Sequence, residues 1–389
     1  MRSLPVVATK GTGLDRLLAD PALIPDRPTL LCANYTSVAA DLTRGLDGLV
    51  AAGIPLVGVL TPEHGYWGAA QAGDSDGDGR DERTGVPLLD TYRLDPPAIA
   101  ELIRGSQAEQ ILLDLQDIGT RFYTYMWTMY DVLCAAQDVG IPLIIADRPN
   151  PLGPTVQGPG LEESCSSFVG RVDIPLRHGL TIGELGTWFA RRRACADLVS
   201  VLEARPGADD DPLAPERWVM PSPNIPTPTT AVLYPGLGLI EGTSLSEGRG
   251  TTRPFELIGA PWTDARLAAA LRERQLPGVE IREAMLRPMF SKHSGLTLHG
   301  VQIHVIDPAA LDPLAVGFAV IDAAHRLYPE QPIWREQTDL VPPRPEGHPP
   351  FIDLLWGSPA LRHGIDAGKD LAQVLADSPP APSPQEDLR

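Results

Sequence analysis

Cysteine is scarce in this sequence and is not placed to form a recognisable framework. Four cysteines occur in 389 residues, far apart and without a CxxC pair or a histidine at metal spacing: Cys32, Cys134, Cys165 and Cys195. Disulfide-stapled secreted domains and zinc modules have cysteines at short, regular spacings. The sequence therefore argues against both classes and predicts reduced thiols in a cytosolic protein, with Cys32 and Cys134 as small core residues.

Positive charge is also scarce. Lys and Arg number 32 against 50 Asp and Glu, which gives a formal net charge of −18. A nucleic-acid partner needs a Lys/Arg surface to meet its phosphates, so this balance argues against one. No apolar run approaches about 18 residues, which argues against a membrane span. The apolar stretch near the N-terminus is too short for a secretory signal, and we expect a cytoplasmic protein.

Signatures of common cofactors are missing or incomplete. Arg16 stands where a dinucleotide fingerprint beginning at Gly11 needs its third glycine, and neither GxxxxGK[ST] nor HExxH occurs. Residues 74–79 (DSDGDG) resemble the start of a calcium loop, but Gly85 stands where a bidentate Glu is needed. The sequence therefore predicts no cofactor and no metal, and residues 74–79 are expected to form a solvated acidic loop.

Short apolar runs dominate the first half. They are continuous rather than alternating and cover residues 29–34, 55–60, 110–115 and 142–146. Such runs are typical of strands that are buried on both faces of a parallel sheet. Helical patterns lie between the runs, at spacings that fit right-handed crossovers: 38–52, 96–105 and 121–139. The predicted fold is α/β, a Rossmann-like open parallel sheet with helices on both faces.

The second half has a different pattern. Residues 151–260 are rich in loops, and aromatic residues among them favour order. A helix, a strand and a helix are expected at 263–275, 299–306 and 312–327. We predict a Rossmann-like domain over 1–260, a smaller auxiliary α+β domain over 261–378, and a flexible tail over 379–389, which lacks apolar residues to dock it.

Polar residues follow each predicted strand at its carboxyl end, where ligands bind in open α/β sheets. Behind the four strands, in order, stand Asn34; Glu63 and His64; Asp114, Gln116, Asp117, Arg121, Tyr123 and Tyr125; and Arg148 and Asn150. Arg121, Tyr123 and Tyr125 are expected at a helix start, where an anion gains from the helix N-terminus and a guanidinium. The sequence therefore predicts a binding site at this edge of the sheet.

Later loops add further candidates. His178, like His64, lies in a polar, glycine-flanked loop rather than in an apolar strand, which favours contact with a substrate. Two long polar motifs, PSPNIPT and EGTSLSEGRGTT, contribute Ser222, Asn224, Glu247, Arg249 and Thr251. Loops of this length inside a compact domain are commonly functional.

With these motifs assembled, the chain resembles the exo-β-N-acetylmuramidase family of bacterial peptidoglycan recycling, the NamZ-like glycoside hydrolases. The segments that carry the resemblance, in one consistent order, are TPEHGYWG, TGVPLLDTY, LLDLQDIGTRFYTYMWTM, ADRPNPLG, SFVGRVDIPLRHGLTIGEL, PSPNIPT, EGTSLSEGRGTTRPFELIGAPW, HGVQIHV and FIDLLWGS. The chain departs from the family in two places. Many members carry an export signal, which we do not expect in this sequence. The family's glycine- and glutamate-containing loop after PEHG is replaced here by DSDGDG.

The resemblance implies a Rossmann-like domain that carries the site and an enzyme that removes N-acetylmuramic acid from the non-reducing end of peptidoglycan fragments. Glycoside cleavage needs an acid for the leaving oxygen and a second group that opposes it. Glu63, at a strand's carboxyl end, is the predicted general acid/base. The expected partner is a small muramyl glycan, and a monomer and a homodimer are both compatible with the sequence.

For the second group the sequence leaves three routes open. In the first, Tyr123 or Tyr125 is the nucleophile, because a neutral phenol avoids repulsion with the lactyl carboxylate of muramic acid. In the second, the substrate's own 2-acetamido group attacks, oriented by Asp117 or Asp114. In the third, one of these aspartates activates water, and the anomeric configuration inverts.

The lactyl carboxylate also needs a cation, and Arg121, Arg148 and Arg249 are the candidates for a bidentate clamp. Ser222, Asn224 and Thr251 are suited to bind sugar hydroxyls or the acetamido group. Two other functions compete with the muramidase: a sugar-binding protein that has lost catalysis, and a metal-dependent hydrolase that uses His64, Asp114, Asp117 and Glu63.

Overall fold

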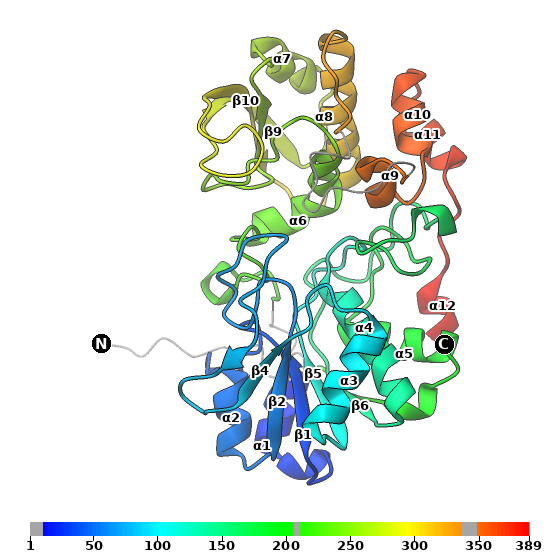
Figure 1. Ribbon diagram of the computed structural model, residues 1–389. Helices are drawn as coiled ribbons and strands as arrows, with labels where there is room; N and C mark the ends of the chain where they lie inside the picture. The colour runs from blue at the N-terminus through cyan, green and yellow to red at the C-terminus, as the bar shows by residue number, and fades with distance from the viewer. Residues whose placement is uncertain (1–10, 206–210, 336–347, 389) are drawn as a thin grey trace.

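The computed structural model describes residues 11–205, 211–335 and 348–388. The chain forms two stacked parts, a lower one built on a seven-stranded sheet and an upper one with a three-stranded sheet (Figure 1). In spatial order the large sheet contains β3 (Gly79–Arg80), β4 (Pro87–Asp90), β2 (Leu56–Thr61), β1 (Thr29–Ala33), β5 (Gln110–Asp114), β6 (Leu143–Ala146) and β7 (Val199–Leu202). Its neighbours pair in parallel, except β3 with β4.

The apolar runs of the large sheet are buried on both faces, as predicted. In β1, Leu30 and Cys32 face one layer of helices, and Leu31 and Ala33 face the other, because successive side chains of a strand point to opposite faces. The second layer contains α1 (Gly13–Ala19) and α2 (Gly45–Ala51), and the first contains α3 (Pro96–Ser106), α4 (Tyr125–Val139) and α5 (Ile182–Arg192). The predicted Rossmann-like fold is confirmed.

The upper part is built on an antiparallel sheet in the order β8 (Leu257–Ala260), β10 (Leu298–Val305) and β9 (Val279–Leu286), with helices α6 (Pro228–Leu237), α7 (Ala265–Glu273) and α8 (Pro313–Leu327). Gly236 lets α6 approach α8 closely, because a Cβ there would lie 1.6 Å from the Pro313 carbonyl oxygen. The predicted boundary at 260–261 stays a prediction, although β8 already pairs with β10.

The C-terminal segment returns from the upper part to the lower one through short helices: α9 (Phe351–Trp356), α10 (Ala360–Asp366), α11 (Leu371–Asp377) and α12 (Pro384–Leu388). The statement that the tail lacks apolar residues to dock it is wrong. Pro384 is buried and Leu388 packs against the main core. The indole N–H of Trp188 in α5 also donates to the Asp387 carboxylate at 2.9 Å.

Two helices begin later than predicted. Residues before α2 form a turn in which the Ala39 N–H donates to the Thr43 carbonyl at 2.8 Å. Residues before α4 form another, in which the Tyr123 N–H donates to the Thr120 carbonyl at 2.9 Å. Arg121 and Tyr123 therefore precede α4 and are not presented by its first turn, contrary to the expectation that they lie at a helix start.

Arg121 is fully buried and holds the two parts together. Its guanidinium donates to the carbonyl oxygens of Pro159 and Ile174, at 2.9 and 2.8 Å, and to those of Leu355 and Trp356 in and after α9, at 3.2 and 2.6 Å. Burial lowers the pKa of Arg121 to about 10. The expectation that Arg121 binds an anionic substrate is wrong, because its guanidinium donates its hydrogen bonds to backbone carbonyl oxygens inside the protein.

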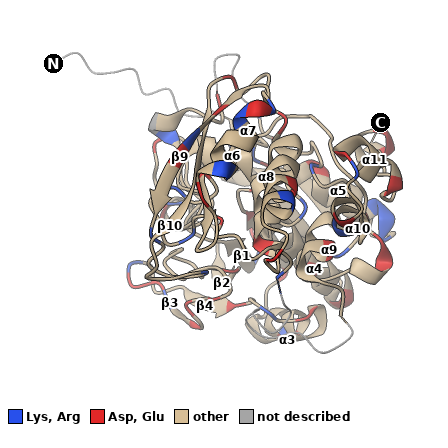
Figure 2. Cartoon of the chain, turned by 90° about the horizontal axis from the view of Figure 1, so that it is seen from above, with Lys and Arg blue, Asp and Glu red and all other residues tan. Residues whose placement is uncertain are grey.

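The four cysteines are free thiols, as predicted. Within the described ranges, no helix is both long and apolar enough to cross a membrane. Seen from above, Lys and Arg are scattered among Asp and Glu rather than gathered on one face (Figure 2).

The contacts of Arg121 predict a large effect on stability. An Arg121→Met variant leaves up to four carbonyl groups without their donor, and each buried unpaired group costs about 1–3 kcal/mol. We expect the free energy of unfolding, measured by urea denaturation, to fall by about 3 kcal/mol or more. Arg104→Met, which removes an exposed ion pair on α3, is the control and should change it by less than about 0.5 kcal/mol. Equal, small losses in both variants would contradict this role.

Candidate functional site

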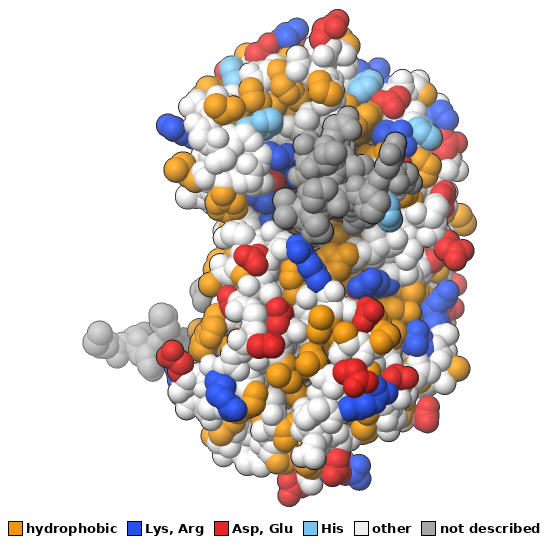
Figure 3. Space-filling model, viewed as in Figure 1, with side chains coloured by type: hydrophobic (Ala, Val, Ile, Leu, Met, Phe, Trp, Pro, Cys, Tyr) orange, Lys and Arg blue, Asp and Glu red, His pale blue; other side chains and the backbone are white. Residues whose placement is uncertain are grey.

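A cavity of about 1070 Å³ lies between the two parts, and the space-filling view shows the outline hollowed at this level (Figure 3). The sheet side of its wall includes Glu63, His64, Tyr92, Arg93, Tyr123 and Thr124, and loops from the middle of the chain add Phe168, Arg171, Ser222 and Asn224. The upper wall includes Tyr234, Glu241, Glu247, Arg249, Phe255, Phe290, Lys292 and Arg335. The cavity is large enough for more than one sugar ring.

Glu63 lies in the loop after β2 and faces this cavity. One carboxylate oxygen accepts the Gly73 N–H at 2.7 Å, and the other accepts the Thr124 hydroxyl at 2.7 Å. Its side chain is almost buried, with 8% of the residue exposed. The two donors come from different segments, one after β2 and one at the start of α4, so the carboxylate is fixed in orientation while it contacts the cavity.

His64 follows Glu63 in a left-handed backbone conformation, with φ of 73°. Its Nδ1 lies 2.9 Å from the Ala70 carbonyl oxygen, and its ring meets that of Tyr125 edge to face. Burial lowers the pKa of His64 below 6.5, although the adjacent Glu63 carboxylate opposes this shift. The imidazole is therefore neutral at neutral pH.

Tyr123 lines the cavity, and Tyr125 lies behind it with ring centroids 5.0 Å apart. Burial raises the pKa of Tyr123 well above 10, and the pKa of Tyr125 is raised for the same reason. Both phenols are protonated at neutral pH. The raised pKa makes it harder for either phenol to lose its proton during attack, which disfavours the expected tyrosine nucleophile and suits a phenol that donates a hydrogen bond.

The upper wall carries a buried group of opposite charges. Arg249 donates to Glu241 at 3.0 Å and lies 3.6 Å from Glu247, and Lys292 lies 2.7 Å from Glu247. Burial alone would raise the pKa of Glu247, but Lys292 and Arg249 outweigh it and hold this pKa below its ordinary value. Arg335 also lines this wall, so cationic side chains face the cavity in a protein of net charge −18.

The two later polar motifs reach the cavity in part. Ser222 and Asn224 line it, and Asn224 donates to Gln71 at 3.2 Å. Thr251 does not line it, because its hydroxyl donates to the Gly248 carbonyl at 2.6 Å and accepts the Arg253 N–H. Thr251 shapes its own loop, and the prediction that it contacts a ligand is not supported.

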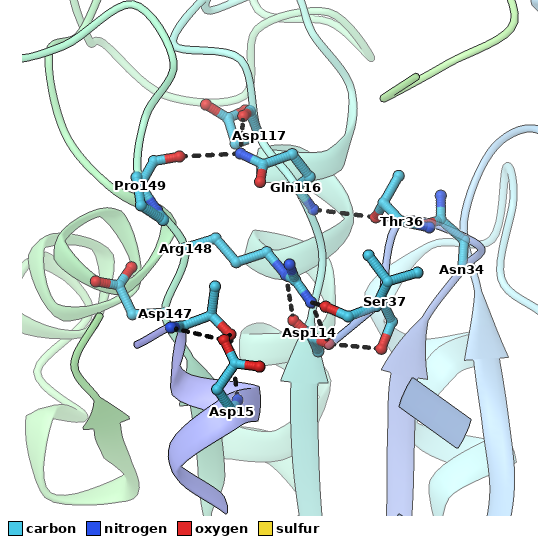
Figure 4. Close-up of polar contacts among 12 residues, drawn as sticks. Asp15, Asn34, Thr36, Ser37, Asp114, Gln116, Asp117, Asp147, Arg148 and Pro149 are labelled. Atoms are coloured by element: carbon cyan, nitrogen blue, oxygen red, sulfur yellow. Dashed lines mark hydrogen bonds and ion pairs between the residues drawn. The ribbon is translucent and has the colours of Figure 1, made fainter. Parts of the chain in front are cut away.

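Asp114 and Arg148 lie at the ends of β5 and β6 (Figure 4). The guanidinium of Arg148 donates to both oxygens of Asp114, at 2.5 and 2.9 Å, and Ser37 donates to the same carboxylate at 2.5 Å. Both side chains are almost completely buried. Each neutralises the other, and together they tie three strand ends into one unit. Neither lines the large cavity, so their predicted contacts with a substrate are not supported by it.

Other predicted site residues also stabilise the strand ends rather than line the cavity. Asp117 accepts the Gly119 N–H at 2.6 Å and faces His178, whose Nε2 lies 3.1 Å away. Since His178 Nδ1 accepts the Leu180 N–H at 3.2 Å, the ring proton resides on Nε2 and points to Asp117. The predicted catalytic role of Asp117 and the substrate role of His178 are not supported.

Gln116, Asn150 and Asn34 complete this inner layer. Gln116 donates to the Pro149 carbonyl at 3.0 Å (Figure 4). Asn150 donates to the Leu180 carbonyl at 3.0 Å and accepts the Leu152 N–H at 2.9 Å. The Asn34 amide oxygen accepts the Thr36 hydroxyl at 2.6 Å. These side chains hold backbone in place, and their predicted substrate contacts are not supported.

Sequence reasoning missed several cavity residues. Tyr92, Phe168, Tyr234 and Lys292 line the cavity but come from segments far from any predicted strand end. Tyr92 lies in TGVPLLDTY and Phe168 in SFVGRVDIPLRHGLTIGEL, two of the segments that carry the family resemblance. Membership in those segments was the signal that could have identified both residues as candidates. Lys292 lies outside the quoted motifs.

The residues proposed for a metal-dependent hydrolase do not come together. Asp114 is paired with Arg148 and Asp117 faces His178, whereas Glu63 and His64 line the cavity. Over the described ranges, no group of three His, Cys, Asp or Glu side chains is placed to hold a metal ion.

A family model described as "Exo-beta-N-acetylmuramidase NamZ, N-terminal" matches residues 29–229, and one described as "Exo-beta-N-acetylmuramidase NamZ, C-terminal" matches residues 232–381. A peptidoglycan beta-N-acetylmuramidase NamZ from Bacillus subtilis (strain 168) is 43% identical over 327 residues, which cover 82% of this chain and 78% of that protein.

Solved structures agree with the fold. Two crystal structures of DUF1343 family proteins from Bacteroides fragilis NCTC 9343 superpose with TM-scores of 0.79 and 0.71, at 29% and 26% identity. Each match covers 94% of this chain and 93% of the other chain.

The environment of His64 predicts a pH effect on stability. Because its pKa is below 6.5 in the folded protein, the unfolded chain binds more protons as the pH falls through 6.5. Stability is therefore fully present above pH 6.5 and is lost below it, by at most about 1.4 kcal/mol per pH unit. His64→Asn, which tolerates the left-handed backbone, should flatten this loss in urea denaturation curves measured at several pH values. An unchanged slope would show that His64 titrates normally.

Proposed function

The chain belongs to the NamZ family of exo-β-N-acetylmuramidases, and from this premise we propose that it releases N-acetylmuramic acid from the non-reducing end of peptidoglycan fragments. The enzyme is a glycoside hydrolase. The observation that carries the proposal is Glu63, a carboxylate fixed by two donors in the wall of a cavity sized for a glycan. A cavity with both a fixed carboxylate and a cationic wall suits an anionic sugar.

In the proposed reaction Glu63 is the general acid/base. Its carboxyl group donates a proton to the glycosidic oxygen as the bond from that oxygen to the sugar's C1 breaks. The carboxylate then takes a proton from the water that completes hydrolysis. Thr124 and Gly73 keep the carboxylate oriented through both steps, since each holds one of its oxygens.

For the second group we propose the substrate's own 2-acetamido oxygen. Attack of this oxygen on C1 needs neither a tyrosine nucleophile nor an aspartate that activates water, and the orienting role expected of Asp117 or Asp114 is not open to them, because both are paired within the protein. The burial of Tyr123 and the pairing of Asp114 and Asp117 disfavour those two routes. Tyr123, as a neutral phenol in the cavity wall, is placed to donate a hydrogen bond to the sugar, and Ser222 and Asn224 add further polar contacts.

For the lactyl carboxylate we propose Arg249 as the partner. Of the three candidate arginines, Arg121 and Arg148 are committed inside the protein, whereas Arg249 lines the cavity. Lys292 lines the same wall, so an anionic ligand there would meet two cationic side chains. Phe255, with its ring 5.0 Å from the Arg249 guanidinium, holds the side chain in place.

The proposed acid role predicts a dependence on the leaving group. Glu63→Gln should lower kcat for the disaccharide of N-acetylmuramic acid and N-acetylglucosamine by about 10³-fold. For the 4-nitrophenyl β-N-acetylmuramide the loss should be smaller, because that leaving group needs little protonation. Glu101→Gln, which removes an exposed carboxylate on α3, is the control and should leave both rates unchanged. Equal losses on the two substrates would argue against an acid role.

The proposed role of Arg249 predicts how the enzyme distinguishes two sugars that differ only in the lactyl ether. The wild type should hydrolyse 4-nitrophenyl β-N-acetylmuramide in preference to the matching N-acetylglucosaminide. Arg249→Gln should lower kcat/KM for the muramide by about 30-fold, the loss expected for a charged hydrogen bond of about 2 kcal/mol. Arg249→Lys should restore part of it. If Arg249→Gln kept the wild-type preference for the muramide over the N-acetylglucosaminide, the lactyl group would not bind to Arg249.

A further inference from the structure

We infer that His64 takes part in the reaction by accepting a hydrogen bond from the N–H of the substrate's 2-acetamido group. The inference rests on the proposed function, because it assumes that Glu63 protonates the leaving oxygen and that the acetamido oxygen attacks C1. It adds a catalytic residue that supports the attacking group, a task that is not open to Asp114 and Asp117 because both are paired within the protein.

The ring of His64 presents an acceptor, not a donor, at Nε2. Nδ1 lies 2.9 Å from the Ala70 carbonyl oxygen, and because a carbonyl oxygen only accepts, Nδ1 carries the ring proton. The backbone of Gln71 acts on the ring in the same sense. Burial lowers the pKa of His64 below 6.5, and the Arg249 charge acts in the same direction, against that of Glu63. At neutral pH the ring therefore keeps a lone pair on Nε2.

This lone pair is available to a ligand. His64 lines the cavity, and within the described ranges Nε2 makes no hydrogen bond, although it is not sealed from solvent. The ring of Tyr125 meets the imidazole edge to face, with centroids 6.5 Å apart, and this packing limits rotation of the imidazole. Nε2 is thus an oriented acceptor in the cavity wall.

The backbone of His64 is held in an unfavourable conformation. Its φ of 73° lies in the left-handed region, which residues with a side chain rarely adopt. The N–H of His64 donates to the Asp74 carbonyl at 2.9 Å, and the nearby Gly73 N–H donates to Glu63 at 2.7 Å. One loop, residues 70–74, therefore fixes both side chains. Strain of this kind persists mainly at functional sites, where the surrounding structure enforces it.

The position of His64 beside Glu63 matches the substrate. In a β-linked 2-acetamido sugar the glycosidic oxygen is on C1 and the acetamido nitrogen is on C2, and the two substituents are equatorial neighbours. A wall that offers an acid to the first atom therefore needs an acceptor for the N–H next to that acid. Glu63 and His64 are consecutive residues, and both line the cavity.

Carboxylates elsewhere in the cavity wall are engaged in other contacts. Glu241 and Glu247 pair with Arg249, and Asp95 accepts a backbone N–H at the start of α3. These carboxylates are therefore less suited than His64 to accept the acetamido N–H.

The hydrogen bond to His64 strengthens as the reaction proceeds. Attack of the acetamido oxygen forms a bond to C1 while the bond from C1 to the leaving oxygen breaks, and Glu63 donates its proton to that oxygen. The acetamido group becomes a cyclic oxazolinium whose charged N–H binds Nε2 more strongly than the neutral amide does. Water then adds to C1, the ring opens to restore the acetamide, and Glu63 takes the water's proton. An interaction that is stronger in the transition state than in the bound substrate raises the rate.

Two variants at position 64 test the role of Nε2. His64→Asn keeps an amide donor near the Ala70 carbonyl and tolerates the left-handed backbone, but it has no group at the position of Nε2. We expect kcat/KM for 4-nitrophenyl β-N-acetylmuramide to fall by about 100-fold. His64→Gln, whose side-chain amide reaches that position, should restore part of the loss. His304→Asn, at an exposed histidine of β10, is the control and should keep the wild-type rate.

A series of substrates separates catalysis from a structural role. In the N-difluoroacetyl and N-trifluoroacetyl analogues of this substrate, fluorine weakens the attacking oxygen and makes the amide N–H more acidic. We expect kcat/KM to fall along the series in the wild type, and to fall more steeply in His64→Asn, because the more acidic N–H gains more from an acceptor. The ratio of wild-type to His64→Asn rates should grow by about fivefold from the acetyl to the trifluoroacetyl substrate.

Each contrary result has a distinct meaning. A His64→Asn rate equal to that of the wild type would overturn the inference, and so would an equal loss on every substrate of the series, which indicates a structural role. A wild-type rate that fluorine does not change would overturn the inference together with the acetamido route, while hydrolysis itself upholds the exo-muramidase. Failure to hydrolyse both the acetyl substrate and the disaccharide of N-acetylmuramic acid and N-acetylglucosamine would overturn the proposed function as well.

Discussion

The fully buried Arg121 joins the loop region after β6 to the end of α9, which lies more than two hundred positions after Arg121 in the sequence. Its guanidinium donates to carbonyls of the loop region after β6 and to those at the end of α9. A buried cation without a carboxylate partner is costly unless its donors are used, so the surrounding backbone must stay close to its observed positions. The loops that carry Phe168 and Arg171, and the end of α9, are thereby held at fixed places beside the cavity.

Charged residues at the carboxyl edge of the sheet divide into two layers with different tasks. The inner layer, centred on the Asp114–Arg148 pair, is closed: its charges and most of its hydrogen-bonding groups are used within the protein. The outer layer, which includes Glu63 and His64, faces the cavity. The inner layer makes the strand ends rigid, and a rigid base allows the Glu63 carboxylate to keep the orientation that acid/base catalysis requires.

Local patterns in the sequence identified the fold and the edge of the sheet that carries the site. The apolar runs predicted β1, β2, β5 and β6, and the residues behind them included Glu63, His64 and Tyr123, which line the cavity. Local patterns did not distinguish Glu63 from Asp114, because the partner that removes Asp114 from the site is Arg148, 34 positions away. Lys292 was missed for the same reason, because it reaches the cavity only through the packing of the two parts. Tyr92 was missed because β4, the strand that it follows, was not predicted.

A crystal structure of the Glu63→Gln protein with the intact disaccharide of N-acetylmuramic acid and N-acetylglucosamine tests the central claim most directly. The account predicts that the residue 63 amide lies within hydrogen-bond distance, about 3 Å, of the glycosidic oxygen, with the lactyl carboxylate on Arg249. A disaccharide bound in the cavity with its glycosidic oxygen distant from residue 63 would contradict the account.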